Sequence, residues 1–336
     1  MNGNADMIIR ESSTATLSVV VPVHNEAGNI APLIERVSAV LAGNVREWEI
    51  IFVNDGSTDA TKDAITEEIT KDGRILLLNF SRNWGHQAAI LAGIVHARGD
   101  MVVTMDGDLE HPPEKIPEMI EMWKKGYDVV MCRREEAPER GWFKGVTSRM
   151  FYRLFNRLSD IRIEENAADF RLISSKVREV LSSLPEQNLF IRGIIPWIGF
   201  SSTSIFYKEA TRKNEKSKYS LKRMLSLALG GLVSFSVIPL RLAVIFGAVC
   251  CLFSFAYAVW IIFSYFLGYG DYVRGWSTLA VSILFMGGVQ LLCLGVLGEY
   301  VGRIFIEVKR RPGFIVESYD GKGLVNDNDY NRKGLR

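Results

Sequence analysis

Two long apolar segments in the last third of the chain constrain its fold more than any other feature. Residues 240–267 contain one charged side chain, Arg241, and residues 276–301 contain one, Glu299. A helix of about 27 residues is about 40 Å long, which crosses a hydrocarbon core of about 30 Å with some tilt. A buried core helix is the alternative, but such helices rarely exceed about 20 residues without a polar face. The sequence therefore predicts two transmembrane helices.

The residues around these segments predict their orientation. Residues 268–275 form a short connection, so the two helices should make a hairpin. Basic side chains precede the hairpin within 212–223 and follow it within 303–311. Because Lys and Arg concentrate on the cytoplasmic side of membrane proteins, we expect both ends of the hairpin in the cytoplasm. We therefore expect a multi-pass protein of the inner (cytoplasmic) membrane.

The overall charge excludes one class of partner. The 336 residues carry 40 Lys and Arg against 38 Asp and Glu, which gives a formal net charge of +2. So small a charge makes no global field for nucleic acid, and any useful positive charge must be local. The four cysteines have neither metal-ligand spacing nor the spacing of a disulfide framework, so we expect them to be reduced.

The N-terminal two thirds alternate between apolar runs and helical patterns. Apolar runs that are typical of buried strands occur at residues 17–23, 49–53, 75–79 and 101–105. Amphipathic patterns that are typical of helices lie between them, for example at 30–41. This alternation predicts an α/β fold with a mainly parallel, doubly wound sheet, in which ligands bind beyond the carboxyl ends of the strands.

Two aspartates follow the last of these runs. Asp106 and Asp108 are separated only by Gly107, and paired carboxylates suit Mg²⁺ or Mn²⁺ bridging a diphosphate. The pair alone is a weak indication, because aspartates are also common in turns and caps, but its place after a buried strand favours a metal site. Neither a G-x-G-x-x-G turn nor a G-x-x-x-x-G-K-[ST] loop occurs, which argues against a dinucleotide enzyme or a P-loop ATPase.

Several ordered blocks carry a family resemblance. LSVVVPVHNEAGNI, EIIFVNDGSTDAT and NFSRNWGHQAAILAGIVHARGDMVVTMDGDLEHPPE resemble the family 2 glycosyltransferases of the GT-A fold. ADFRL at 168–172, RKNEKSKYSL at 212–221 and LGEYVGRIFIEVKRRP at 297–312 are similar to the polyprenyl-phosphate branch, which includes dolichyl-phosphate mannose synthases. Within it, IEENAADFRLIS and PEQNLFIRGIIPWIGF resemble the bactoprenol glucosyltransferases of O-antigen modification.

The resemblance implies a metal-dependent enzyme of the cell envelope. It implies inverting transfer of one sugar onto undecaprenyl or another polyprenyl phosphate, with Mg²⁺ or Mn²⁺ as cofactor and UDP-glucose as the favoured donor. We also expect a homo-oligomer. The expected parts are a disordered tail (1–16), a GT-A catalytic domain (17–218), a juxtamembrane amphipathic segment (219–239), two transmembrane helices (240–303) and a cytoplasmic tail (304–336).

The resemblance also implies roles for single residues on the donor side. Asp106 and Asp108 would hold the metal and the diphosphate. Glu110 stands where many relatives have Gln, and it would either join the metal shell or unbalance its charge. Gly107 replaces the usual Ala at a position that needs only to be small. The nucleotide-sugar would contact Pro22, Asn25, Glu26, Asp55 and Asp106, with Asp55 on the base or ribose.

On the acceptor side, the resemblance marks Asp169 as the candidate base and Arg171 as counter-charge. A phosphate monoester has a second pKa near about 6, so this acceptor scarcely needs a strong base. We therefore expect Asp169 to take a residual proton or to face the oxocarbenium-like sugar. Cationic residues expected at the acceptor phosphate or the membrane surface are Arg134, Lys144, Arg149, Arg153, Arg212 and Lys218.

Part of this expectation rests on one amphipathic pattern. Arg149, Arg153 and Arg157 are four residues apart with apolar residues among them, which is typical of a basic helix on a membrane surface. The solvated face of a core helix is the alternative. Among the histidines, we expect His86 to line the donor cleft and His96 to lie on a helix surface.

Three other interpretations stay open. The same reaction with GDP-mannose, UDP-GlcNAc or a UDP-aminoarabinose derivative is one of them. A processive polysaccharide synthase normally carries Q-x-x-R-W and a larger membrane domain, whereas Arg192 here is followed by glycine. A non-catalytic membrane scaffold that binds nucleotide-sugars is the third, and the intact Asp106, Asp108 and Asp169 argue against it.

Overall fold

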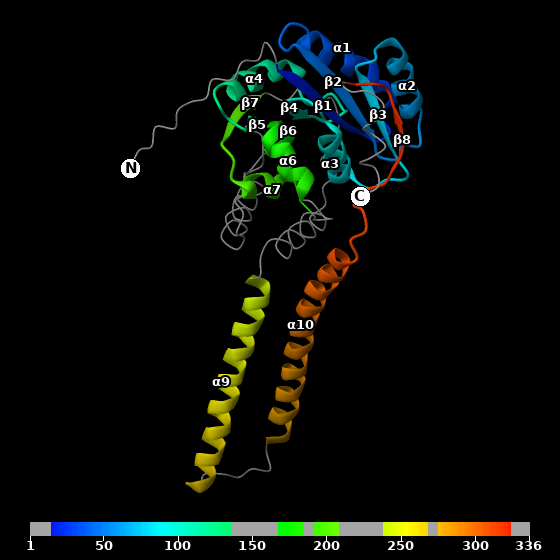
Figure 1. Cartoon of the computed structure of the whole chain (residues 1–336). Helices are drawn as coiled ribbons and strands as arrows, with labels where there is room; N and C mark the ends of the chain where they lie inside the picture. The colour runs from blue at the N-terminus through cyan, green and yellow to red at the C-terminus, as the bar shows by residue number, and fades with distance from the viewer. Residues whose placement is uncertain (1–14, 136–166, 185–190, 208–237, 268–274, 324–336) are drawn as a thin grey trace, which may run out of the picture. The chain divides into compact units, whose positions relative to one another are not determined.

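The computed structural model describes residues 15–135, 167–184, 191–207, 238–267 and 275–323 (Figure 1). The chain divides into two compact units. The α/β unit comprises Met1–Tyr152, Arg162–Lys216 and Arg311–Arg336, and the helical unit comprises Arg153–Ile161 and Ser217–Arg310. The C-terminal residues therefore belong to the same unit as the N-terminal ones.

The α/β unit is built on one sheet, which has eight strands among the described residues. Their order is β7-β5-β6-β4-β1-β2-β3-β8. The strands are β1 (Thr16–Val23), β2 (Glu47–Asn54), β3 (Ile75–Phe80), β4 (Met101–Thr104), β5 (Val129–Arg134), β6 (Ala167–Ser174), β7 (Ser202–Tyr207) and β8 (Val316–Asp320).

The pairing confirms the predicted fold class. Strands β4, β1, β2 and β3 run parallel, and β5 runs parallel to β7. Two strands are antiparallel to their neighbours: β6, inserted between β4 and β5, and β8, at the edge beside β3. Because β1, β2, β3 and β4 point the same way, the loops that follow them emerge at one edge of the sheet, which we call the carboxyl edge.

Helices cover both faces of this sheet (Figure 1). The layer on one face contains α1 (Ile30–Leu41), α2 (Thr61–Lys71) and α4 (Ile116–Lys124), and the layer on the other contains α3 (His86–His96) and α6 (Ser175–Ser183). The remaining helices of this unit are η1 (Ala27–Asn29), η2 (Pro113–Lys115) and α7 (Ile191–Ile198). The sheet is thus covered on both sides, which explains why its central strands β1 to β4 are mainly apolar runs rather than alternating patterns.

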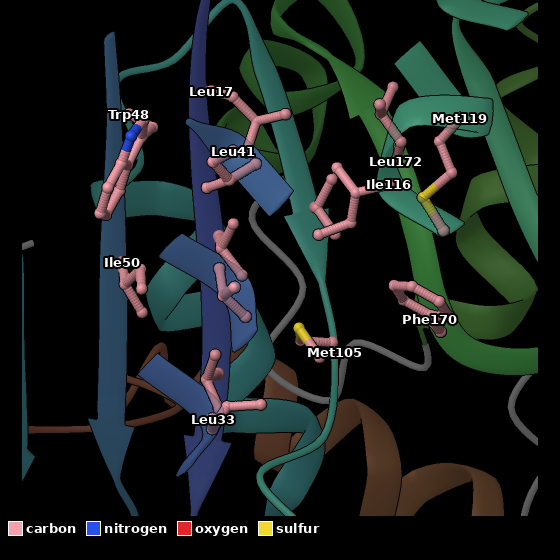
Figure 2. Packing of buried hydrophobic residues seen from close by; sticks show 14 of the residues in the cluster. Leu17, Leu33, Leu41, Trp48, Ile50, Met105, Ile116, Met119, Phe170 and Leu172 are labelled. Atoms are coloured by element: carbon pink, nitrogen blue, oxygen red, sulfur yellow. The ribbon is translucent and has the colours of Figure 1, made fainter. Parts of the chain in front are cut away.

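The main core lies between the sheet and the layer of α1 and α4. Leu33 and Leu41 lie on the buried face of α1 over β1, with Leu41 near Leu17 and Leu33 toward the other end of the strand (Figure 2). Phe170 and Leu172 of β6 belong to the same cluster, beside α4. Full burial of side chains of this size stabilises the fold by about 1.5–3 kcal/mol each. The core therefore fixes β6, and with it the residues between Phe170 and Leu172.

The opposite face is closed by α3, which approaches the sheet through a glycine. A Cβ atom at Gly93 would lie 2.1 Å from Cγ1 of Val20, so any larger residue would push α3 away from β1. This close approach sets the position of the whole helix. Its first residue, His86, is thereby placed at the carboxyl edge.

The helical unit consists of α9 (Ile238–Phe266) and α10 (Trp276–Val308) in its described part. The two helices touch, with Cys293 Sγ 4.0 Å from the carbonyl oxygen of Ala243. Among the described residues, one helical stretch, Phe285–Val308, has the length and composition to cross a membrane, and Ala243–Tyr257 forms a shorter apolar stretch. One of the two predicted spans therefore meets that criterion.

The ends of the chain differ from the predicted boundaries. β1 begins at Thr16, within the predicted tail 1–16, and the predicted tail 304–336 contains the end of α10 and all of β8. The sequence VESYD escaped prediction because an edge strand can be short and polar. His96, which we expected on a helix surface, is buried, and its Nε2 lies 3.2 Å from the hydroxyl of Tyr319 on β8.

Candidate functional site

The two aspartates after β4 lie in the turn at the carboxyl edge. The backbone N–H of Asp106 donates to Nδ1 of His111 at 3.0 Å, and the ring of His111 stacks on Phe170 with centroids 5.1 Å apart. His111 is buried, and this burial lowers the pKa of its imidazole. A neutral imidazole leaves Nδ1 free to accept, so His111 holds the backbone of the turn in place.

Asp106 has one carboxylate oxygen without a partner. Its Oδ1 is buried, and no hydrogen bond reaches it from the part of the chain that the structure describes. The imidazole of His86 is close to it, with Nε2 3.4 Å from Oδ1. A buried oxygen of this kind costs free energy unless a cation or donor compensates it. This orphaned atom fits a divalent cation at Asp106.

The neighbouring carboxylates are engaged within the protein. Asp108 Oδ1 accepts from the backbone N–H of Glu110 at 3.0 Å, and Glu110 Oε2 accepts from Arg134 Nη2 at 3.1 Å. Within the described ranges, no three His, Cys, Asp or Glu side chains gather into a metal-binding group. Mg²⁺ at nucleotide sites commonly takes only one or two carboxylates, together with substrate phosphates. The donor set of Asp106 and Asp108 is of that type.

Gly107 has little room for a side chain. A Cβ atom there would lie 2.7 Å from Cγ1 of Val23 and 3.3 Å from the carbonyl oxygen of Pro22. Pro22 is thus the neighbour of the turn from β1. The requirement at position 107 is stricter than small size alone, because even alanine would displace Val23.

A second cluster surrounds Asp169 on β6. Arg171 Nη2 donates to Asp169 Oδ1 at 2.6 Å. Arg192 of α7 donates from Nε to Oδ1 at 3.0 Å and from Nη2 to Oδ2 at 2.7 Å, which is a bidentate pair. Asp169 and Arg171 are buried, whereas the side chain of Arg192 remains 41% exposed. One buried carboxylate thus organises two guanidinium groups.

The ionisation of Asp169 follows from these contacts. Burial alone would raise its pKa, but hydrogen bonds from His86 and Arg192 and the charge of Arg171 outweigh burial and hold the pKa far below its ordinary value. For the cationic Arg171, burial has the opposite sign and lowers the pKa, and the negative charge of Asp169 opposes that effect. An ionised carboxylate with so low a pKa is a weak proton acceptor.

His86 connects the two clusters. Its Nε2 lies 3.4 Å from Asp106 Oδ1 and 3.5 Å from Asp169 Oδ2. Burial lowers its pKa, but the two carboxylates outweigh burial, and the net pKa of His86 is raised above its ordinary value. The next residue, Gln87, also donates from Nε2 to Asp169 Oδ2 at 3.4 Å. The start of α3 therefore joins the turn after β4 to Asp169, near the start of β6.

Asp55 positions this start of α3. Its carboxylate accepts from the backbone N–H of Trp84 at 2.6 Å and of Gly85 at 3.0 Å. The resemblance implied a role for Asp55 on the base or ribose, which stays a prediction. In the structure its side chain is 4% exposed and engaged with these two amides, and these contacts help to place His86.

The loops after β1 and β2 hold each other. The N–H of Asn25 donates to Ser57 Oγ at 3.0 Å, and the N–H of Thr58 donates to Asn25 Oδ1 at 2.8 Å. The N–H of Glu26 donates to Thr61 Oγ1 at 2.9 Å. Asn25 and Glu26 therefore lie beside the loop that follows β2.

The structure brings together only some of the predicted site residues. Arg134, expected at the acceptor phosphate, pairs with Glu110 and donates from Nε to the hydroxyl of Tyr207 at 3.1 Å. Arg192 and Gln87 were not predicted as site residues. The only sequence signal for Arg192 was the family resemblance of the block PEQNLFIRGIIPWIGF, which contains it. Five predicted residues lie outside the described residues: Lys144, Arg149, Arg153, Arg212 and Lys218.

Comparison with known proteins matches both units. Residues 18–181 match the model of glycosyl transferase family 2, and residues 238–304 match the GtrB C-terminal hairpin. The SfII prophage-derived bactoprenol glucosyl transferase of Shigella flexneri is 44% identical over 301 residues, which cover 90% of this chain and 97% of that one.

Two further comparisons differ in weight. The uncharacterized glycosyltransferase YkcC of Bacillus subtilis (strain 168) is 42% identical, and the match covers 92% of this chain and 97% of that one. The structure of glucosyl-3-phosphoglycerate synthase from Mycobacterium tuberculosis with Mn²⁺, UDP-glucose and phosphoglyceric acid has a TM-score of 0.43 at 20% identity, covering 65% of this chain and 78% of that one. Similarity at that level says nothing about the ligands of this chain.

Proposed function

The chain belongs to glycosyl transferase family 2 and contains a GtrB-type hairpin at residues 238–304, and we propose that it glucosylates a membrane lipid phosphate. The proposed reaction transfers one glucose from UDP-glucose to undecaprenyl phosphate, with inversion, at the cytoplasmic face of the membrane. The bactoprenol glucosyl transferase from Shigella flexneri supports the sugar and the acceptor, because its similarity extends over nearly the whole chain.

The observation that carries this proposal is the junction at His86. One imidazole nitrogen lies within 3.5 Å of Asp106 on the diphosphate side and of Asp169 on the acceptor side. A donor diphosphate beside Asp106 and an anionic acceptor beside the two arginines would therefore be neighbours. That arrangement suits displacement of a nucleoside diphosphate by a phosphate oxygen, in which the reacting groups must lie about 3–3.5 Å apart.

The proposed role of Asp169 is to hold cations rather than to remove a proton. Arg171 and Arg192 bind its two oxygens and would thereby place positive charge beside the acceptor phosphate, which guanidinium groups recognise well. The acceptor is already largely ionised near neutral pH, so its own oxygen can attack the sugar carbon. This role departs from the candidate base that the family resemblance implied.

The proposed cofactor is Mg²⁺ or Mn²⁺ at Asp106 and Asp108. A divalent cation there would stabilise the negative charge of the departing diphosphate. The orphaned Oδ1 of Asp106 supports this assignment, whereas the contact between Glu110 and Arg134 supports leaving Glu110 out of the metal shell. Pro22, Asn25 and Glu26 would line the nucleotide from the loop after β1.

We also propose that α9 and α10 cross the membrane together. β8 pairs with β3, so the chain that precedes α9 and the chain that follows α10 belong to one sheet. If one segment crosses, the chain must cross back, and the number of crossings is even. A 29-residue helix such as α9 spans about 43 Å, which is long enough for the second crossing.

The experiment is a transfer assay with purified full-length protein in lipid nanodiscs. UDP-glucose, GDP-mannose, UDP-GlcNAc and a UDP-aminoarabinose derivative are each offered with undecaprenyl phosphate and Mg²⁺ or Mn²⁺. We expect one labelled glucose per lipid, with inverted stereochemistry, and no product with EDTA. Activity with a different donor would change the assigned sugar. A polymeric product would indicate a processive synthase, and no transfer from any donor would favour a non-catalytic scaffold that binds nucleotide-sugars.

A further inference from the structure

Buried amide side chains connect the last strand of the sheet to the loop after β2. Glu317 lies on β8, Asn79 on β3 and Asn54 at the end of β2. Glu317 Oε2 accepts from Asn79 Nδ2 at 3.0 Å, and Asn79 Oδ1 accepts from Asn54 Nδ2 at 2.6 Å. The connection thus crosses three neighbouring strands near the carboxyl edge.

The connection continues into the loops at the donor side. Asn54 Oδ1 accepts from the backbone N–H of Ser57 at 3.1 Å, and Ser57 Oγ accepts from the N–H of Asn25 at 3.0 Å. Asn25 has a φ of 59°, a conformation that residues other than glycine rarely adopt. Such a conformation persists only where surrounding contacts hold it, and Ser57 and Thr58 provide those contacts.

The groups at the two ends, the Glu317 carboxylate and the backbone N–H of Ser57, determine which partner donates in each of these hydrogen bonds. A backbone N–H can only donate, and the carboxylate of Glu317 can only accept. Asn54 must therefore turn its oxygen to Ser57, and Asn79 must turn its amide nitrogen to Glu317. Because Asn54 is 2% exposed and Asn79 is 5% exposed, water is a poor replacement for a lost partner.

We propose that Glu317 is a positioning residue for the nucleotide-sugar. It acts through Asn79 and Asn54 on the loop 54–58 and thereby on Asn25, and this inference rests on the proposed function only for the identity of the ligand. Glu317 itself is exposed, so replacing it leaves the core intact. A residue in the segment after the hairpin would thus set donor affinity at the loops that follow β1 and β2.

The test compares variants of the full-length protein in nanodiscs. Glu317→Ala removes the acceptor, whereas Glu317→Gln keeps an amide oxygen that accepts the same bond. The matched control is Asp320→Ala on the same strand, because no side-chain hydrogen bond or ion pair of Asp320 occurs among the described residues, and its backbone pairing with Leu77 is unaffected by the substitution. Asn79→Asp places two acceptors opposite each other, and adding Glu317→Gln restores a donor–acceptor pair.

The first readout is independent of any ligand. Hydrogen exchange of peptides that cover 54–58 should accelerate about three- to tenfold in Glu317→Ala, while peptides from β1 and β4 keep their protection. Glu317→Gln and Asp320→Ala should match wild type. Asn79→Asp should exchange faster than wild type, and the double variant N79D/E317Q should recover most of the difference.

The second readout uses UDP with Mg²⁺ in calorimetry and the donor kinetics of the transfer assay. We expect Glu317→Ala to raise the Kd of UDP and the donor KM about three- to tenfold, with kcat within about twofold of wild type. Unchanged exchange in Glu317→Ala, or no recovery in the double variant, would overturn the proposal. If wild type binds no UDP, the donor assignment fails, and the exchange readout still decides whether Glu317 positions the loop.

Discussion

Asp106 and Asp169 are two carboxylates at one edge of the sheet, both within 3.5 Å of the same histidine nitrogen, yet their surroundings are opposite. Asp169 is saturated by two arginines, whereas Asp106 keeps a buried oxygen without a hydrogen bond among the described residues. The saturated group holds cations that belong to the protein. The unsaturated group is suited to a cation that arrives with the substrate. Residue type alone therefore does not assign a role at this edge.

The largest effect should come from disrupting the proposed metal site of Asp106 and Asp108. We expect Asp108→Ala to lower turnover about a thousandfold or more and to abolish metal-dependent binding of UDP, because one remaining carboxylate holds a diphosphate-bridging ion poorly. Calorimetry with UDP, with and without Mg²⁺, measures the binding. The control is Asp63→Ala, an exposed carboxylate on α2. Metal-dependent binding that survives in Asp108→Ala would contradict the assignment.

On the saturated side, we expect Asp169→Asn to lower kcat about a hundredfold and to retain measurable activity. The remaining activity should rise between about pH 6 and pH 8 as the acceptor phosphate loses its second proton. A flat, undetectable profile, with UDP binding intact, would instead make Asp169 the essential base.

The stability difference between wild type and Asp169→Asn has its own pH dependence. The folded-state pKa of Asp169 lies below the value of about 3.9 in an unfolded chain. Its stabilising contribution is therefore fully present above about pH 5 and is lost only as pH falls toward the folded value. Asp169 also helps to raise the pKa of His86, so the difference in stability should narrow as pH rises through the titration of His86. Thermal unfolding should show this narrowing and a constant difference at higher pH.

A smaller effect is expected for Arg192, which is partly exposed. Arg192→Gln should raise the acceptor KM about tenfold and leave the Kd of UDP unchanged, because the arginine would bind the acceptor phosphate. Arg192→Lys should recover little, since an ammonium group cannot replace the bidentate pair with Asp169. Arg36→Gln, at a surface pair with Glu114, serves as the control. A change confined to UDP binding would move Arg192 to the donor side.

The smallest effect should follow from Glu110→Gln. Its carboxylate pairs with Arg134, so we expect kcat/KM within about threefold of wild type and an unchanged metal requirement. The concentration of Mn²⁺ that gives half-maximal activity measures that requirement. A tenfold shift in that concentration would place Glu110 in the metal shell and show that a carboxylate paired within the protein can also bind the cation.

The sequence was sufficient for the elements that repeat a local pattern. The runs that became β1 to β4 are mainly apolar and are buried over nearly their whole length, and a parallel sheet covered on both faces produces that pattern. Once the run that became β4 is identified, the position of Asp106 and Asp108 in the turn after that strand follows from the sequence. The direction of β6 does not follow, because an apolar strand has the same periodicity whether it pairs parallel or antiparallel.

The partners of charged side chains were harder to predict than the strands. Arg192 meets Asp169 across 23 positions of sequence, and Arg134 meets Glu110 across 24. No local periodicity relates such residues, and only the packing of α7 and β5 brings them together. Asp55 illustrates the same limit, since its amide partners lie in the turn before α3.

The late position of β8 in the chain also affects how the protein is synthesised. β3 ends at Phe80, but the strand that covers its outer edge begins at Val316, roughly 236 residues later. At about 5–20 residues per second, a ribosome needs about 12–47 s to make that interval. During this time the nascent sheet presents an open edge, the kind of surface on which chains aggregate. The hairpin must therefore be synthesised before the edge is covered, so a stall within α9 or α10 would leave an aggregation-prone domain.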